Sequence, residues 1–463
     1  NGNTILEEIK STREELKKID LDYHQEHLSQ LKLYAYLYGL INNMSIVPVR
    51  LTYISVDDYK TKKFNFILTI DELKDFFYKS IDDYTRWHQT LSEASTVKLD
   101  TLKDITFPFA NKRQGQSELM KATYLTMKAN SILYAIAPTG IGKTMATIFS
   151  TLKSMTKPNE KLFYLTAKTI GREVAIDSFR MLQNEGLKLH AIVISSKAKS
   201  CASKMQHCDP EKCSFAKGYF SRLRQAIEDI YTNEILYNQE TIMKYALKYN
   251  ICPFEYSLDL SYFCDAIICD YNYVFDPKAH LIRYFEDTEY QPKILCDESH
   301  NLVERSKDMY SAEFDSLLPL RIEEKISSYD KTITKNIRHF YDELKKYDDL
   351  VNKDLFYYSH LLDDLMLSSL KQIVQKAELV LADNKEIKDR DEILTDYFLL
   401  KDFVDTAEFF GQSHMFVVKK IEDNHFQIEI KCLILFMILL RIKLRVLFFL
   451  VQPYFHLNTI WIY

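Results

Sequence analysis

Glycine is scarce in this sequence, with nine residues in 463, whereas tyrosine is abundant, with 31. This bias says more about codon usage than about fold. An excess of positive charge is also missing: the formal net charge is −5, which excludes a globally basic nucleic-acid-binding protein. Any nucleic-acid site must therefore be a local patch of Lys and Arg side chains. No N-terminal segment combines a basic stretch, an apolar core and a small-residue cleavage site, so we expect a cytoplasmic protein.

The length of the chain predicts several domains. A chain of 463 residues exceeds what one hydrophobic core usually supports, and about two to four domains are expected. The chain begins with Asn1 in a strand-like segment, without an initiator Met. We therefore expect a fragment of a longer protein.

Residues 137–144, Ala-Pro-Thr-Gly-Ile-Gly-Lys-Thr, form the most informative segment. They follow a strand-like run at 132–136 and precede a helix-like run at 145–149. This order is typical of a phosphate-binding loop, whose backbone N–H groups turn toward phosphate oxygens. Lys143 is expected to reach the β and γ phosphates of ATP, and the Thr144 hydroxyl to ligate Mg²⁺. The residues expected to bind the nucleotide in this loop are Pro138, Thr139, Gly140, Gly142, Lys143 and Thr144.

A second segment indicates hydrolytic chemistry. A strand-like run at 293–296 leads into Asp297-Glu298-Ser299-His300. An Asp at the end of a strand can hold Mg²⁺ through water, and the adjacent Glu can orient and deprotonate an attacking water. The tetrapeptide alone would indicate only an exposed acidic loop. Because a phosphate-binding loop precedes it, we interpret it as the hydrolytic half of a nucleoside triphosphatase site.

Seven of the eight cysteines fall into two groups. Disulfides are not expected in a reducing cytosol, which leaves buried thiols or metal ligands. Cys264, Cys269 and Cys296 lie in apolar strand-like runs, where free cysteines are commonly buried.

The other group lies in polar sequence and is a candidate for metal binding. Cys201, Cys208, Cys213 and Cys252 are separated by six, four and thirty-eight residues. Zinc sites usually contain closely spaced Cys pairs, whereas four thiolates at irregular spacing suit an iron–sulfur cluster. The spacing of the four cysteines alone does not decide between zinc and an iron–sulfur cluster as the bound metal group.

Together these segments resemble the XPD/DinG-type iron–sulfur helicases of superfamily 2, over about residues 105–305. The Ser299 position is Ala in the family pattern, but that residue has no chemical role. The resemblance includes three further segments: Arg113-Gln114-Gly115-Gln116, Tyr164-Leu165-Thr166-Ala167-Lys168-Thr169, and Asp270-Tyr271-Asn272-Tyr273-Val274-Phe275-Asp276-Pro277.

The resemblance implies an α/β fold. A RecA-like P-loop domain, a parallel sheet flanked by helices, would comprise 101–200 and 253–305, with an inserted iron–sulfur domain at 201–252. The implied activity is an ATP-dependent DNA helicase that couples ATP hydrolysis to translocation on single-stranded DNA, in DNA repair or processing. No membrane partner is implied.

The resemblance also implies residue roles. Arg113 and Gln116 would contact the adenine side of ATP, although without the family Gln116 would be interpreted as a solvated residue at a helix start. The single-strand backbone would be contacted by Thr166, Lys168 and Thr169. The catalytic set would be Lys143, Asp297, Glu298 and His300, and the ligands of a [4Fe-4S] cluster Cys201, Cys208, Cys213 and Cys252.

Residues 1–100 contain a different pattern. A short strand ends in Glu8-x-Lys10, and a helix with Gln30 and Tyr34 follows. This resembles the C-terminal half of a PD-(D/E)xK nuclease of the RecB-like kind, an α/β remnant. Residues two apart in a strand face the same side, so Glu8 and Lys10 should point into one site. The resemblance makes Glu8 a metal ligand and Lys10 the group that polarises phosphate or water; the alternative is an exposed strand edge. The family's upstream Asp has no counterpart here.

The sequence of the C-terminal third indicates two further regions, 306–432 and 433–463. Residues 306–432 have helically spaced apolar residues, and the resemblance implies an Arch domain that encloses the single strand with the cluster domain. A helical bundle for partner contacts is the alternative. Residues 433–463 contain no Asp, Glu, Gly, Ala or Ser. Charges at Arg441, Lys443 and Arg445 leave no apolar run of about eighteen residues, which disfavours a transmembrane span.

We expect residues 433–463 to be an aberrant tail from out-of-frame translation or a degraded gene end. The resemblance implies a second RecA-like domain with a Gln-x-x-Gly-Arg-x-x-Arg motif that supplies an arginine finger, and no such motif occurs in this sequence. A finger contributes about 10³–10⁵ in rate, so this chain alone should be a poor ATPase. The competing hypotheses are a non-catalytic ATP- and DNA-binding module, and a zinc-stabilised P-loop protein without a nucleic-acid role.

Overall fold

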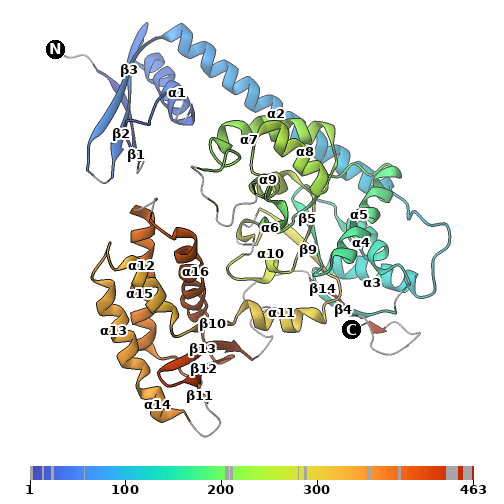
Figure 1. Ribbon diagram of the computed structural model, residues 1–463. Coiled ribbons are helices and arrows are strands. Elements are labelled where there is room, and N and C mark those ends of the chain that lie inside the picture. Colours follow the sequence, from blue (N-terminus) through green and yellow to red (C-terminus); the bar gives the residue numbers. More distant parts are fainter. Residues whose placement is uncertain are drawn as a thin grey trace. The chain divides into compact units, whose positions relative to one another are not determined.

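The structure is a computed structural model in which the chain forms two compact units (Figure 1). The first comprises Asn1–Lys98, Gly218–Asn233 and Lys248–Ile251, and the second Leu99–Lys217, Glu234–Leu247 and Cys252–Tyr463. The structure describes residues 4–12, 15–21, 25–56, 58–138, 140–203, 208, 212–279, 281–285, 289–351, 356–383, 387–433, 447–451 and 461–462.

The first unit contains a three-stranded sheet with the order β1-β2-β3. The strands β1 (Leu6–Thr12) and β2 (Ile46–Ser55) are parallel, and β2 pairs antiparallel with β3 (Thr61–Thr69). A parallel pair needs a crossover, which helix α1 (Gln25–Ile41) supplies. Alternate residues of β2 form one core with the buried face of α1; this core includes Leu31, Ala35, Val47, Val49, Leu51 and Tyr53.

The connector that follows is more helical than the sequence indicates. The helical spacing of apolar residues at 71–87 predicts a helix there, with 88–106 as a connector, and helix α2 runs from Ile70 to Asp104 through most of that connector. Trp87 of α2 contacts Tyr231 of α7 (Tyr219–Asn233), with ring centroids 5.3 Å apart. Because α7 belongs to the first unit, the segment 201–252 that we predict as one inserted domain is divided between the two units.

The second unit contains an eight-stranded sheet with the order β15-β4-β14-β9-β5-β8-β6-β7. Neighbouring strands are parallel, except that β15 is antiparallel to β4. Apolar runs such as the one in β8 suit strands that are buried on both faces. The strands are β4 (Ile132–Ile136), β5 (Glu160–Leu165), β6 (Ala191–Val193), β7 (Leu236–Tyr237), β8 (Ala266–Cys269), β9 (Gln291–Cys296), β14 (Leu447–Val451) and β15 (Trp461–Ile462).

Helices cover both faces of this sheet, with α4 and α5 on one side and α9 and α10 on the other (Figure 1). The prediction of an α/β fold with a parallel sheet flanked by helices is confirmed. The helices of this part are α3 (Gln116–Ala129), α4 (Lys143–Ser154), α5 (Thr169–Asn184), α6 (Lys197–Ser200), α8 (Gln239–Tyr249), α9 (Pro253–Leu260), α10 (Asn272–Phe275) and α11 (Asn301–Met309), with 3₁₀ turns at Ser261–Phe263 and Ile282–Tyr284.

Two short strands from residues 433–463, where we expect an aberrant tail, belong to the eight-stranded sheet. Strand β14 lies between β4 and β9 and is parallel to both, with Leu447 level with Ile132 and with Ile294. Five consecutive apolar residues, Leu-Phe-Phe-Leu-Val, suit such an interior strand. None of the helices in the described ranges is both long and apolar enough to cross a bilayer.

Residues 306–432, which we expect to be helical, also contain an antiparallel sheet with the order β10-β13-β12-β11. Strands β12 and β13 form a hairpin whose turn contains Asn424 in the left-handed conformation, with φ 59°. The sequence shows apolar–polar alternation after this turn, at 425–432, and our helical interpretation missed it. The elements are β10 (Ala312–Asp315), α12 (Leu318–Ile326), α13 (Ile333–Leu344), α14 (Lys346–Leu350), β11 (Phe356–Ser359), α15 (Asp364–Asp383), α16 (Arg390–Ala407), β12 (His414–Glu422) and β13 (His425–Cys432).

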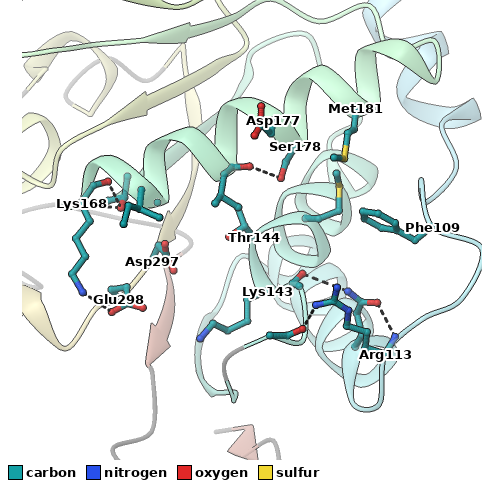
Figure 2. Close-up of a pocket in the computed structure, with 18 of the residues that line it drawn as sticks. Phe109, Arg113, Lys143, Thr144, Lys168, Asp177, Ser178, Met181, Asp297 and Glu298 are labelled. Carbon is teal, nitrogen blue, oxygen red and sulfur yellow. Dashed lines mark hydrogen bonds and ion pairs between the residues drawn. The ribbon is translucent and has the colours of Figure 1, made fainter.

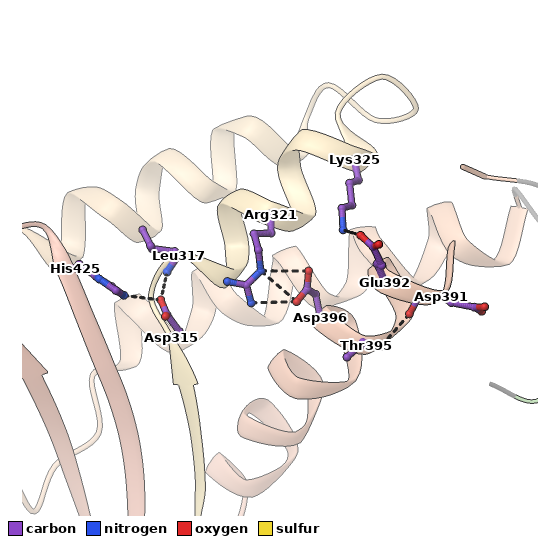
Figure 3. A network of polar contacts seen from close by, with 9 residues as sticks. All are labelled: Asp315, Leu317, Arg321, Lys325, Asp391, Glu392, Thr395, Asp396 and His425. Carbon is purple, nitrogen blue, oxygen red and sulfur yellow. Dashed lines mark hydrogen bonds and ion pairs between the residues drawn. The ribbon is translucent and has the colours of Figure 1, made fainter. Parts of the chain in front are cut away.

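Polar contacts hold this region together at its edges (Figure 3). The Arg321 guanidinium of α12 donates to the Asp396 carboxylate of α16, with Nη2 3.0 Å from Oδ1. The Lys325–Glu392 pair joins the same two helices at 2.8 Å. Planar, two-pronged Arg–carboxylate contacts are stronger than exposed Lys pairs, so Arg321 contributes more to the alignment of α12 with α16.

Candidate functional site

The phosphate-binding loop has the strand–loop–helix order that the sequence predicts. It connects β4 to α4, whose first residue is Lys143, so the unpaired N–H groups of the first helical turn face the loop. Gly140 and Gly142 have φ of 85° and 75°, a region that favours glycine. Pro138 lies in the loop, and the predicted Thr139 lies outside the described residues. A Cβ atom on Gly142 would lie 2.7 Å from Nε2 of Gln116, so the loop accepts no side chain there.

Gln116, the first residue of α3, and Arg113, which precedes that helix, brace this loop. The Gln116 side chain is 3% exposed; its Oε1 accepts from the backbone N–H of Arg113 at 3.1 Å, and its Nε2 donates to the carbonyl of Ile141 at 2.8 Å. The Arg113 guanidinium donates to the carbonyl of Gly140. The interpretation of Gln116 as a solvated residue is therefore wrong, because its amide is buried and bonded to backbone groups.

Lys143, Asp297 and Glu298 converge at the carboxyl ends of β4 and β9. The Lys143 ammonium donates to the carbonyl of Ala137 at 3.3 Å. Burial lowers the pKa of Lys143, and the negative charges of Asp297 and Glu298 oppose this shift. Burial raises the pKa of Asp297, and a hydrogen bond from the Tyr164 hydroxyl opposes that change. A half-buried ammonium and a buried carboxylate thus face a site where phosphate and a cation could compensate their charges.

Glu298 has a strained backbone and two basic neighbours. Its φ is 53°, in the left-handed region that non-glycine residues rarely adopt. The Lys168 ammonium lies 3.4 Å from Oε2 of Glu298 (Figure 2). Nε2 of His300 lies 3.6 Å from the same oxygen. Strained backbone of this kind is common at functional sites.

A cavity of about 840 Å³ unites these residues (Figure 2). Its size is within the range of small-molecule sites. The predicted residues in its lining are Arg113, Gln116, Gly140, Gly142, Lys143, Thr144, Thr166, Lys168, Asp297 and Glu298. Phe109 and Met181 line the same cavity, and our sequence analysis missed both. Neither residue belongs to a recognisable motif. A Phe or Met side chain is ordinarily interpreted as part of the hydrophobic core.

The three residues expected to contact DNA differ in their exposure to solvent. Thr166 is 1% exposed and lines the nucleotide cavity. Lys168 and Thr169 are exposed at the start of α5. Surface access for a DNA strand therefore exists at Lys168 and Thr169, whereas Thr166 faces inward.

The four candidate cluster ligands all belong to the second unit. Cys208 is exposed, Cys213 is buried, and the other two are half-buried. Cys252 precedes α9; burial raises the pKa of its thiol, and hydrogen bonds from the backbone N–H groups of Glu255 and Phe254 oppose part of this shift.

The described part of the chain contains no group of three or more His, Cys, Asp or Glu residues that could hold a metal ion. The expected four-thiol set is therefore not assembled in these ranges, and residues 204–207 and 209–211 lie outside them. The donor chemistry does suit an iron–sulfur cluster. Burial lowers the pKa of Lys197, but a hydrogen bond with Cys208 and the nearby charges of Cys208, Glu255 and Cys252 raise it above its ordinary value.

In the first unit, the four nuclease-like residues form one chain of contacts. Glu8 and Lys10 share a face of β1, as the two-residue period predicts, with Oε1 and Nζ 2.9 Å apart. Lys10 also donates to Oε1 of Gln30 at 2.9 Å, and Nε2 of Gln30 donates to the Tyr34 hydroxyl at 3.3 Å. β1 is an edge strand of its sheet, so the alternative of a strand edge with ordinary charges stays open.

Comparison with known proteins gives partial matches. Residues 182–317 match the DEAD_2 family. The chain is 28% identical over 145 residues to the general transcription and DNA repair factor IIH helicase subunit XPD of Dictyostelium discoideum, covering 31% of this chain and 17% of the relative. It is 30% identical over 124 residues to the regulator of telomere elongation helicase 1 homolog of Aedes aegypti, covering 26% and 11%.

Two solved structures are also similar. An XPD helicase matches at 16% identity with a TM-score of 0.49, over 75% of this chain and 60% of its own. A truncated XPD matches at 15% identity with a TM-score of 0.45, over 74% and 95%. The sequence matches span less than a fifth of the length of the two curated relatives.

Proposed function

We propose that this chain is the ATP-binding motor of a DNA helicase of the XPD/DinG type, which couples ATP hydrolysis to movement along single-stranded DNA in repair or processing. One observation supports this most strongly. A single cavity brings the phosphate-binding loop together with Asp297 and Glu298, although these segments are more than 150 residues apart in sequence.

The residues of the cavity suggest a division of roles. Lys143 would neutralise the β and γ phosphates, and Thr144 with Asp297 would hold Mg²⁺, which offsets the phosphate charge. Glu298 would orient the attacking water and accept its proton while the bond between the γ phosphorus and the ADP oxygen breaks, giving ADP and phosphate. The Lys168 ammonium and the His300 imidazole lie 3.4 and 3.6 Å from the Glu298 carboxylate and would fix its orientation.

Two further roles belong to this proposal. Cys201, Cys208, Cys213 and Cys252 would hold a [4Fe-4S] cluster, which would cross-link the segment 201–252. Residues 306–432 would take the place of an Arch domain beside the DNA strand. A single strand would then contact exposed groups such as Lys168 and Thr169 through its phosphates.

Single-stranded DNA is expected to bind more tightly than duplex. Because the chain is net acidic, its phosphate contacts must be few, and each contributes about −0.7 to the slope of log K against log salt. We expect a total slope of about −2 to −4. Fluorescence anisotropy with an oligothymidine and a duplex of equal length measures both affinities.

Lys168→Ala should weaken single-strand binding and reduce the slope of log K against log salt by the contribution of about one phosphate contact. Lys103→Ala is a matched control, because it removes a similarly exposed charge away from the cavity. The Lys103 side chain is 72% exposed and that of Lys168 is 59% exposed. Equal or tighter duplex binding would contradict the proposal. Loss of binding in the control alone would contradict the role of Lys168.

A second candidate role belongs to the first unit. The contacts among Glu8, Lys10, Gln30 and Tyr34 favour a RecB-like nuclease remnant. Within the described ranges no further carboxylate joins Glu8 to complete a metal site. We therefore expect no Mn²⁺-dependent cleavage of single-stranded or duplex DNA by this chain.

Gel analysis of labelled DNA with Mn²⁺ tests this expectation. Glu8→Gln is the informative variant, and Glu7→Gln is its control because Glu7 lies on the opposite face of β1. Cleavage by the parent chain that Glu8→Gln abolishes and Glu7→Gln retains would show a complete nuclease site.

A further inference from the structure

A buried tyrosine hydroxyl lies between the two groups assigned to Mg²⁺. Tyr164 is in β5, in the apolar run Leu-Phe-Tyr-Leu, and is 2% exposed. The sheet core would accept Phe at such a position, and a buried hydroxyl costs free energy unless it is hydrogen-bonded. The partners of this hydroxyl therefore indicate why a polar atom is present.

Both partners belong to the proposed nucleotide site. The Tyr164 hydroxyl lies 3.4 Å from Oγ1 of Thr144 and donates a hydrogen bond to the Asp297 carboxylate. A second tyrosine fixes the other side of Asp297, because the Tyr271 hydroxyl donates to its main-chain carbonyl. One hydroxyl thus contacts a residue of the phosphate-binding loop and a residue that follows β9.

The packing around Asp297 leaves little freedom. A Cβ atom on Gly171 would lie 3.1 Å from Oδ2 of Asp297 and 2.5 Å from Oγ1 of Thr166. The absence of a side chain at Gly171 therefore lets the start of α5 approach the carboxylate closely. Tyr164 and Gly171 restrict the same carboxylate from two elements, β5 and α5.

We propose that Tyr164 is a positioning residue that holds Thr144 and Asp297 in the arrangement that binds the divalent cation of the nucleotide. The inference rests on the proposed nucleotide site. Groups that hold metal ligands through hydrogen bonds change metal affinity by about 10–100-fold when they are removed. A hydroxyl with a merely structural role would change stability but not the cation requirement.

The test is the Mg²⁺ dependence of nucleotide binding by the full chain. A fluorescent ATP analogue is titrated against the parent and Tyr164→Phe, over a series of Mg²⁺ concentrations and in EDTA. We expect Tyr164→Phe to raise the Mg²⁺ concentration at half-maximal effect by about 10-fold or more, with the affinity in EDTA unchanged.

Tyr284→Phe is the matched control. Tyr284 is also fully buried, and its hydroxyl lies 2.8 Å from that of Ser261, but it does not line the cavity. This variant should keep the Mg²⁺ dependence of the parent. If Tyr164→Phe does not fold, as judged by its thermal transition, Gly171→Ala provides the second test, because its Cβ would displace Asp297 or Thr166 and should also raise the Mg²⁺ requirement.

The outcomes separate this inference from the proposed function. If the parent binds no nucleotide, the proposed function fails. If the parent and Tyr284→Phe bind in a Mg²⁺-dependent way and Tyr164→Phe behaves like them, only the role of Tyr164 is overturned. Equal weakening with Mg²⁺ and in EDTA would also overturn it.

Discussion

Cys208→Ser and Cys213→Ser are each expected to lose the iron that the parent chain retains after anaerobic purification. A [4Fe-4S] cluster needs four thiolates, so removing one should reduce the iron from about four atoms per chain to near zero. The segment 201–252 should become easier to digest with protease, because the cross-link is lost. Iron analysis and the visible absorption spectrum measure the effect, since an iron–sulfur cluster is coloured and zinc is not.

Cys264→Ser and Cys269→Ser are the matched controls and should keep their iron. Both thiols are completely buried, and burial raises their pKa values, so they remain protonated in the core. The Cys264 thiol donates to the carbonyl of Leu260 at 3.4 Å, which is a structural role. Stoichiometric zinc without iron in the parent, or loss of iron from the controls alone, would contradict the cluster assignment.

The nucleotide site is predictable from sequence where its residues are neighbours in the chain. The loop at 137–144 and the segment at 297–300 each have a local pattern that fixes their conformation and chemistry. That they meet follows from a parallel sheet, because the carboxyl ends of its strands lie at one edge. Glu8 and Lys10 were predictable for a similar reason, since residues two apart in a strand share a face.

Other features depend on partners that are distant in sequence. Tyr164 looks like a core residue until β5 is placed beside β9, which brings Asp297 next to its hydroxyl. The bracing role of Gln116 needs the carbonyl of Ile141, 25 residues away. The assignment of α7 to the first unit depends on its contacts with α2, and neither helix alone indicates them.

The strands of residues 306–432 were missed for a different reason. Helical spacing dominates this region, and β10 and β11 are only four residues long. Such short strands have too few residues to show a period of two. Only the hairpin at 414–432 is long enough to have revealed the sheet.

The second large effect is expected for Lys143→Ala, which should remove nucleotide binding. Lys143 is a half-buried cation of the cavity, and with bound nucleotide it would form a buried charge pair with the β and γ phosphates. Loss of one member of such a buried charge pair costs about 2–5 kcal/mol, which is roughly 30-fold to several thousand-fold in affinity. Lys153→Ala is the control, because Lys153 is on the same helix but donates to the carbonyl of Ile105 outside the cavity.

The central claim is that the loop at 137–144 and Asp297-Glu298 form one Mg·ATP site. The most direct measurement is an equilibrium titration of Mg·ATP against the parent, Lys143→Ala and Lys153→Ala, with thermal transitions recorded to show that all three fold. The account predicts binding by the parent and by Lys153→Ala, and a loss of at least about 30-fold for Lys143→Ala. Equal affinity of the folded Lys143→Ala variant and the parent would contradict it.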